Sequence, residues 1–212
     1  PFTRLTILES GHNDETRKGA YTHSMSLRSD IGGIQAIERL GLTDAVFSIG
    51  TGSAGFFVAS ADGALVVTTK WLDAPPRSGV RVNRFQLWSL LLARATELGA
   101  VVQWGVRVHD IKVVNNVAHV HFQRDDSSSS QELSTIAADV AVVCDGARSP
   151  LREQLTGARR HFLNTIIIGF TVDGLAPVVP EELRHQHGLL VGAGSTCFVA
   201  DENNNRELVS LS

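Results

Sequence analysis

Hydrophobic positions recur along this chain with two periods, and each period predicts one kind of element. Short apolar or alternating runs predict β-strands. These runs cover residues 5–8, 24–27, 56–58, 65–69, 101–104, 106–114, 117–122, 139–144, 165–171, 189–191, 196–200 and 208–212. Ile34, Ile37 and Leu40 recur near helical spacing instead, and Gly41 is placed to end that helix.

Residues 84–98 give the strongest helix signal in the chain. Asn83 is a good N-cap, and Gln86 stands three residues later, as in a capping box. One face of the predicted helix carries four leucines: Leu87, Leu90, Leu91 and Leu98. Gly99 is placed to end the helix.

Polar stretches between these runs predict turns and loops. Asp62-Gly63 and Asn115-Asn116 are expected to turn two hairpins. Residues 11–20 and 125–130 are polar throughout and are expected to form loops. The pattern from residue 101 to residue 122 therefore predicts an antiparallel hairpin behind the long helix.

The stretch from residue 140 to residue 152 joins an apolar run to the start of a helix. Residues 140–144 are typical of a strand buried on both faces, as in a parallel sheet, which favours the α/β class. Ser149 is a natural N-cap, and Pro150 suits the first helical position. Asp145 and Gly146 then follow the carboxyl end of the strand, where open α/β sheets bind ligands. The alternative is an ordinary connection between a strand and a helix.

Composition and charge limit the possible classes of protein. The 212 residues are 43% hydrophobic and 19% charged, which indicates a globular chain. A net charge of −3 and the absence of a basic cluster argue against nucleic-acid binding. No apolar run reaches the roughly 20 residues of a transmembrane helix. Cys144 is expected in the core of its strand, and two thiols without metal spacing favour a reducing, cytoplasmic location.

Two histidines share one face of a predicted strand. His119 and His121 alternate with apolar residues, so they could contribute to a metal site. No third ligand stands near them in the sequence, which favours two solvent-facing histidines. No metal site is predicted.

Three features in this order resemble the FAD-dependent aromatic hydroxylases, the class A flavoprotein monooxygenases that include p-hydroxybenzoate hydroxylase. They are the acidic strand end at Glu9, the pattern Arg84-x-x-Leu87-x-x-x-Leu91, and the segment Asp-Gly-Ala-Arg-Ser-Pro-Leu-Arg at residues 145–152. The resemblance extends from about residue 5 to residue 168. Taken singly, Glu9 could be a solvated charge and Arg84 a surface arginine.

The resemblance implies an α/β, Rossmann-like fold that binds FAD and NAD(P), with an inserted antiparallel sheet on the substrate side. A glycine-rich turn expected upstream of Glu9 is absent, so the chain is interpreted as a fragment that lacks the first strand and this turn. Residues 1–45 and 80–160 are then expected to form a partial FAD-binding domain. Residues 46–79 and 161–212 are expected to form a partial substrate-binding sheet.

The resemblance also implies roles for five residues. Glu9 would accept hydrogen bonds from the adenosine ribose, and Arg84 would neutralise the pyrophosphate. Asp145 and Gly146 would let the backbone approach the cofactor, since glycine has no Cβ. Arg28 lies where the family often has a basic or polar residue near the flavin. No catalytic residue is assigned.

The implied reaction is the hydroxylation of an aromatic or related small molecule. NAD(P)H would reduce FAD, and reduced flavin with molecular oxygen would give a flavin hydroperoxide that transfers one oxygen atom. An FAD-dependent reductase or halogenase, or an inactive truncated chain, remains an alternative. A Rossmann dehydrogenase fits Glu9 but does not account for the later Asp-Gly strand. The sequence does not indicate an oligomeric state.

Overall fold

The computed structural model describes residues 4–12, 24–52, 55–60, 64–70, 77, 79–125, 133–162, 167–172, 187–192, 195–202 and 205–211. The chain divides into two compact units, Pro1–Asp14 with Ala95–Leu163 and Glu15–Arg94 with Asn164–Ser212. The two units are groups of residues that lie close to one another. The cofactor-binding part and the substrate-binding part expected from the sequence are defined by function instead, so that division stays a prediction.

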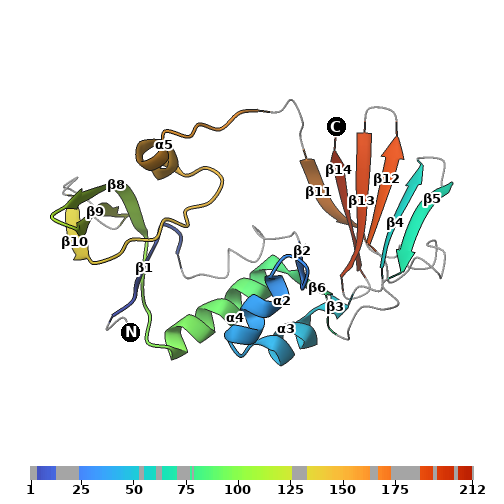
Figure 1. Ribbon diagram of the computed structural model, residues 1–212, viewed down its shortest axis with the longest axis horizontal. Coiled ribbons are helices and arrows are strands. Elements are labelled where there is room, and N and C mark those ends of the chain that lie inside the picture. The colour runs from blue at the N-terminus through green and yellow to red at the C-terminus, as the bar shows by residue number, and fades with distance from the viewer. Residues whose placement is uncertain are drawn as a thin grey trace. The chain divides into compact units, whose positions relative to one another are not determined.

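The first unit is built from two small sheets and one helix (Figure 1). Its elements are β1 (Thr6–Glu9), β7 (Val101–Trp104), β8 (Val106–Val114), β9 (Val117–Arg124), β10 (Ser134–Ala138) and α5 (Pro150–Thr156). β1 pairs with β7 in parallel, so that Glu9 lies opposite Trp104. β8, β9 and β10 form an antiparallel sheet in the order β10-β9-β8.

The predicted hairpin of the first unit is confirmed. Asn115 and Asn116 both have positive φ, 51° and 61°, as a tight turn between twisted strands requires. β9 alternates as its sequence does, because Ala118, Val120 and Phe122 are buried while the residues between them are half-exposed.

The second unit contains a helical layer packed on a three-stranded sheet. Its elements are β2 (Ser24–Arg28), α2 (Gly33–Arg39), α3 (Thr43–Ile49), β3 (Thr51–Gly52), β6 (Gly79–Asn83) and α4 (Arg84–Glu97), which runs on past the unit's boundary. The sheet has the order β2-β6-β3. The core consists of Ile34, Ile37, Leu42, Val46, Val80, Val82 and Leu87. The helices predicted at residues 34–40 and 84–98 are thus confirmed as α2 and α4. Gly41, with φ of 69°, follows the first of them.

One glycine of the second unit is required by packing. A Cβ on Gly50 would lie 2.7 Å from Cγ1 of Val82 and 2.8 Å from the carbonyl oxygen of Arg81. The chain after α3 therefore approaches β6 more closely than any side chain permits.

The second unit also contains a six-stranded sheet in the order β11-β14-β13-β12-β4-β5. Its strands are β4 (Gly55–Ser60), β5 (Leu65–Lys70), β11 (Ile167–Val172), β12 (His187–Gly192), β13 (Ser195–Glu202) and β14 (Asn205–Leu211). All neighbouring pairs are antiparallel except β12 and β4, which are parallel. The strands predicted in these regions are confirmed. The predicted Asp62-Gly63 turn and most of the two predicted loops lie outside the described residues.

The prediction of a buried strand at residues 140–144 is wrong. These residues form no strand, Val140 and Val142 are 59% and 79% exposed, and Cys144 is an exposed free thiol rather than a core residue. An apolar run becomes a strand only where a neighbouring strand completes its hydrogen bonds. Among the described residues no strand pairs with this segment, and its side chains are exposed except for the half-buried Val143.

The predicted leucine face of α4 is only partly buried. Leu87 is 6% exposed and Leu90 packs against the core, whereas Leu91 and Leu98 are 36% and 63% exposed. The helix ends at Glu97, and Leu98 lies in the turn that follows it. Within the described residues, none of the helices has the length and hydropathy that crossing a membrane would require.

Candidate functional site

Glu9 ends β1, as the sequence predicts. Its Oε1 accepts a hydrogen bond from the backbone N–H of Gly11 at 2.7 Å, so the carboxylate turns toward the loop that leaves the strand. The Gly11 carbonyl in turn accepts a hydrogen bond of 3.0 Å from the N–H of Gly105, between β7 and β8. These bonds fix a half-buried carboxylate at the carboxyl end of a parallel strand, where it can accept hydrogen bonds from hydroxyl groups.

Asp145 and Gly146 form the turn before α5. Gly146 has φ of 82°, a conformation that glycine adopts without strain, and no described atom lies within 4 Å of a Cβ built on it. The backbone is therefore open on that side, and a ligand can approach it closely. Asp145 is exposed beside this opening.

Arg152 holds this turn in place. Its Nη2 donates to the carbonyl oxygen of Gly146 at 2.7 Å, and its Nη1 donates to that of Ala147 at 3.0 Å. The Ser149 hydroxyl accepts a hydrogen bond of 2.9 Å from the backbone N–H of Arg152, which confirms Ser149 as the N-cap of α5. No role is predicted for Arg152 from the sequence, although its guanidinium ties the helix to the turn.

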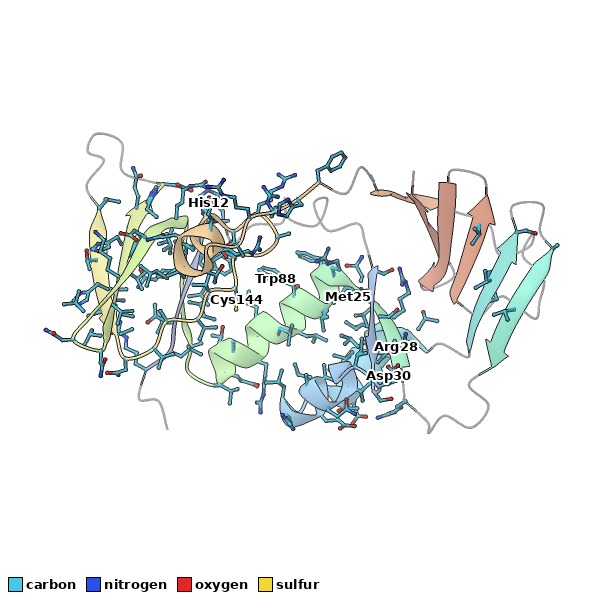
Figure 2. All side chains as sticks on the ribbon, turned by 45° about the horizontal axis from the view of Figure 1, so that its top comes forward. His12, Met25, Arg28, Asp30, Trp88 and Cys144 are labelled. Atoms are coloured by element: carbon cyan, nitrogen blue, oxygen red, sulfur yellow. The ribbon has the colours of Figure 1, made fainter. Side chains whose placement is uncertain are left out.

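Arg28 ends β2 in the second unit. Its Nε donates to Oδ1 of Asp30 at 2.9 Å, and its Nη2 forms an ion pair with Oδ2 of the same residue; the two side chains lie side by side in Figure 2. A Cβ on Gly33 would stand 3.0 Å from the backbone nitrogen of Arg28. This glycine thus allows α2 to begin directly against the end of β2.

Arg84 is the first residue of α4, and its side chain is exposed. Asn83 caps the helix, because its Oδ1 accepts hydrogen bonds from the N–H groups of Phe85 at 2.8 Å and Gln86 at 3.3 Å. A guanidinium at the positive end of a 14-residue helix is well placed to attract an anion.

The two arginines lie at opposite ends of one strand pair. In the register of β2 and β6, Ser24 lies opposite Asn83 and Arg28 lies opposite Gly79. The four steps along the chain from Ser24 to Arg28 span about 13 Å of the strand. Glu9, Asp145 and Gly146 lie in the first unit.

Among the described residues of the first unit, the carboxyl group of Asp110 has a shifted pKa. A hydrogen bond from the side chain of Gln154 in α5, with a smaller effect of Lys112, lowers the pKa of Asp110. Asp110 is therefore ionised over the whole neutral range. Within the described residues, no group of three side chains could hold a metal ion.

Comparison with known families identifies the fold that carries these residues. A family model described as FAD binding domain matches residues 13–195. The chain belongs to this family. It contains Arg28, Arg84, Asp145 and Gly146 in the matched part, and the α/β arrangement is that of an FAD-binding domain.

Individual relatives of this FAD-binding domain agree with the family. The monooxygenase cfoF of Aspergillus candidus is 24% identical over 214 residues, which cover 94% of this chain and 50% of cfoF. The crystal structure of CtdE in complex with FAD and a substrate matches 98% of this chain and 51% of CtdE, with 14% identity and a TM-score of 0.75. That of p-nitrophenol 4-monooxygenase PnpA from Pseudomonas putida DLL-E4 matches 98% and 51%, with 13% identity and a TM-score of 0.71.

The resemblance to flavin-dependent monooxygenases is thus confirmed at the level of the family and the fold. The chain spans about half the length of these relatives.

Proposed function

We propose that this FAD-binding domain belongs to a monooxygenase that uses NAD(P)H and molecular oxygen to hydroxylate an aromatic or related small molecule. The observation that carries the proposal is the turn at Asp145 and Gly146, which is open on one side and held by Arg152. The monooxygenase names of the relatives supply the reaction class.

The described residues fit an FAD molecule in their chemistry. Glu9 offers a fixed carboxylate to the ribose hydroxyls, as strand-end acids do in dinucleotide-binding folds. Arg84 would neutralise the pyrophosphate, because its charge adds to that of the helix end. Arg28, at the opposite end of the β2–β6 pair from Arg84, would contact another part of the extended cofactor.

The turn would serve the cofactor through its backbone. Gly146 leaves room for close approach, and Asp145 would lie beside the flavin and the path of NAD(P)H. Bound FAD would supply the redox chemistry, accepting a hydride from NAD(P)H and activating oxygen once reduced. The chain itself would bind and orient the cofactor and the substrate and would exclude water from them. No acid–base pair among its side chains is then required.

The functional division of the chain is part of the proposal. Residues 1–45 and 80–160 would supply the FAD-binding part, and residues 46–79 and 161–212 the substrate side. The six-stranded sheet supports this division, because all of its strands lie within residues 46–79 and 161–212. The substrate partner would be a small aromatic or related ring compound.

The test compares the whole protein with its Asp145→Ala variant. We expect the variant to bind FAD more weakly and to slow flavin reduction by NAD(P)H, measured as loss of the flavin absorbance band without oxygen. Unchanged affinity and unchanged reduction would refute the role of the turn. Oxygen consumption that requires both NAD(P)H and an aromatic substrate would separate a monooxygenase from a reductase or a halogenase.

A further inference from the structure

Helix α5 lies beside strand β8 (Figure 1), and a polar contact joins the two elements. Nε2 of Gln154 donates a hydrogen bond to Oδ1 of Asp110, and Nζ of Lys112 lies 3.4 Å from Oδ2 of the same carboxylate. Leu151, on the first turn of the helix, is 3% exposed, so this turn of α5 is packed against the protein. Because a hydrogen bond to a carboxylate is directional, the contact between Gln154 and Asp110 orients the helix against the strand.

A β-bulge precedes this carboxylate. The register of β8 against β9 shifts between Val108 and Asp110, so that His109 is the extra residue and Asp110 lies opposite His121. Bulges re-aim the side chain that follows them and are common beside functional sites. The irregularity in β8 therefore falls at the residue that meets α5.

The other end of α5 carries the turn of the candidate FAD site. Arg152, two residues before Gln154, holds the carbonyl oxygens of Gly146 and Ala147. Gln154 and Arg152 belong to the same seven-residue helix, so a contact made at Gln154 restrains the helix that holds the turn. The path of contacts runs from Asp110 through Gln154 and Arg152 to Gly146.

We propose that Asp110 is a positioning residue for the FAD site: through Gln154 it sets the place of α5 and so of the Asp145-Gly146 turn. This inference rests on the proposed function, because it assigns the turn to FAD. Asp110 itself touches no cofactor in this account. Its effect on FAD is carried by the helix.

The charged groups near Asp110 define what a substitution would change. Lys112 lies on the same strand as Asp110, and His121 in β9 is the cross-strand neighbour of Asp110. The Nδ1 atom of His121 lies 2.8 Å from Oγ1 of Thr135. Glu9 of β1 bonds to the N–H of Gly11. On α5, Glu153 is paired with Arg159 at 2.6 Å, which leaves the neutral Gln154 to face Asp110.

The test replaces this amide by a second carboxylate in the whole protein. In Gln154→Glu, two carboxylates would face each other, and like charges at this distance repel. We expect the Kd for FAD, measured by flavin fluorescence at pH 8, to rise about tenfold. The double variant Asp110→Asn with Gln154→Glu keeps the new glutamate but restores an amide–carboxylate pair, and its Kd should return to within about twofold of the wild type.

Two further readouts separate positioning from simple loss of stability. Repulsion between the two carboxylates of Gln154→Glu raises the pKa of one of them, so that this group binds a proton as the pH falls from about 8 to about 5. The FAD affinity of Gln154→Glu should therefore recover over this range. Backbone amide exchange at residues 146–149 should be faster in Gln154→Glu and normal in the double variant. The double variant is the matched control, since it carries the same new glutamate at position 154 but gives it a neutral partner.

The outcomes are distinct. If Gln154→Glu exchanges and binds FAD as the wild type does, Asp110 does not position the turn and the inference fails. If the wild type is folded but binds no FAD, the proposed function fails. In that case amide exchange at residues 146–149 still decides whether Asp110 places the turn.

Discussion

Arg152 donates a hydrogen bond of 2.7 Å from its Nη2 to the carbonyl oxygen of Gly146. The second arm of the guanidinium takes the next carbonyl, that of Ala147, so the planar fork fixes two successive peptide groups. Through this contact a helix side chain determines the shape of the turn that the family resemblance assigns to FAD.

Removing the fork should loosen the turn. In Arg152→Ala, two carbonyl groups lose a charged donor, and such hydrogen bonds are worth roughly 1.5–3 kcal/mol each when buried and less at this partly exposed site. We expect the Kd for FAD to rise about tenfold in a fluorescence titration. Arg159→Ala is the matched control, because it removes only an exposed ion pair with Glu153, and it should leave the Kd unchanged. Equal effects of both variants would contradict this role.

A side chain at the turn itself should be costly. Gly146→Ala forces an L-residue to φ of 82°, which should lower the free energy of unfolding by about 1–2 kcal/mol and weaken FAD binding. Gly157→Ala provides the control, because that glycine has φ of 69° after α5 and also has open space around it. Its stability loss, measured by urea unfolding, should match, but its FAD affinity should stay that of the wild type. A Gly146→Ala protein with unchanged affinity would show that the turn does not face FAD.

The attachment of α5 should depend on pH. The hydrogen bond from Gln154 lowers the pKa of Asp110 in the folded protein. The stabilisation is therefore complete above the ordinary aspartate pKa of about 3.9 and is lost as the pH falls through the lowered value. The side-chain amide resonance of Gln154 should shift in that acid range in NMR spectra. In Asp110→Asn this shift should be absent; a shift that persists there would have another source.

Gly50 should be required for the core of the second unit. Gly50→Ala would drive a methyl group into Val80, Val82 and the carbonyl of Arg81, at a cost of about 1–3 kcal/mol in the free energy of unfolding. Gly52→Ala, two residues on, meets no described atom within 4 Å and is the matched control. Thermal unfolding should show a clear decrease in Tm for the first variant and little change for the second. Equal Tm values would mean that the close approach relaxes readily.

The sequence predicts the elements whose signals are local. Asn83 marks the start of α4, because its side-chain oxygen caps the helix. Asn115-Asn116 indicate a turn, because asparagine tolerates positive φ. The helix α3 is not predicted, because seven residues with Val46 as the one buried position give almost no periodic signal. Strand β6 is also missed: Arg81 interrupts its apolar residues, yet Arg81 is only 6% exposed.

The candidate site shows the same limit. The sequence and the family resemblance together select Glu9, Arg84 and Gly146, whose residue types and positions reflect local chemistry. They cannot show that Gln154 meets Asp110, since this contact joins residues 44 apart in the chain. The buried strand expected at residues 140–144 failed for a related reason: apolar residues describe a tendency to be buried, and burial needs a partner strand.

The most direct test of the central claim is a titration of the purified whole protein with FAD, followed by flavin fluorescence and checked by circular dichroism for folding. We expect saturable quenching, with one FAD bound per chain and weaker binding in Arg84→Gln. A folded protein that leaves flavin fluorescence unchanged at every FAD concentration would contradict it.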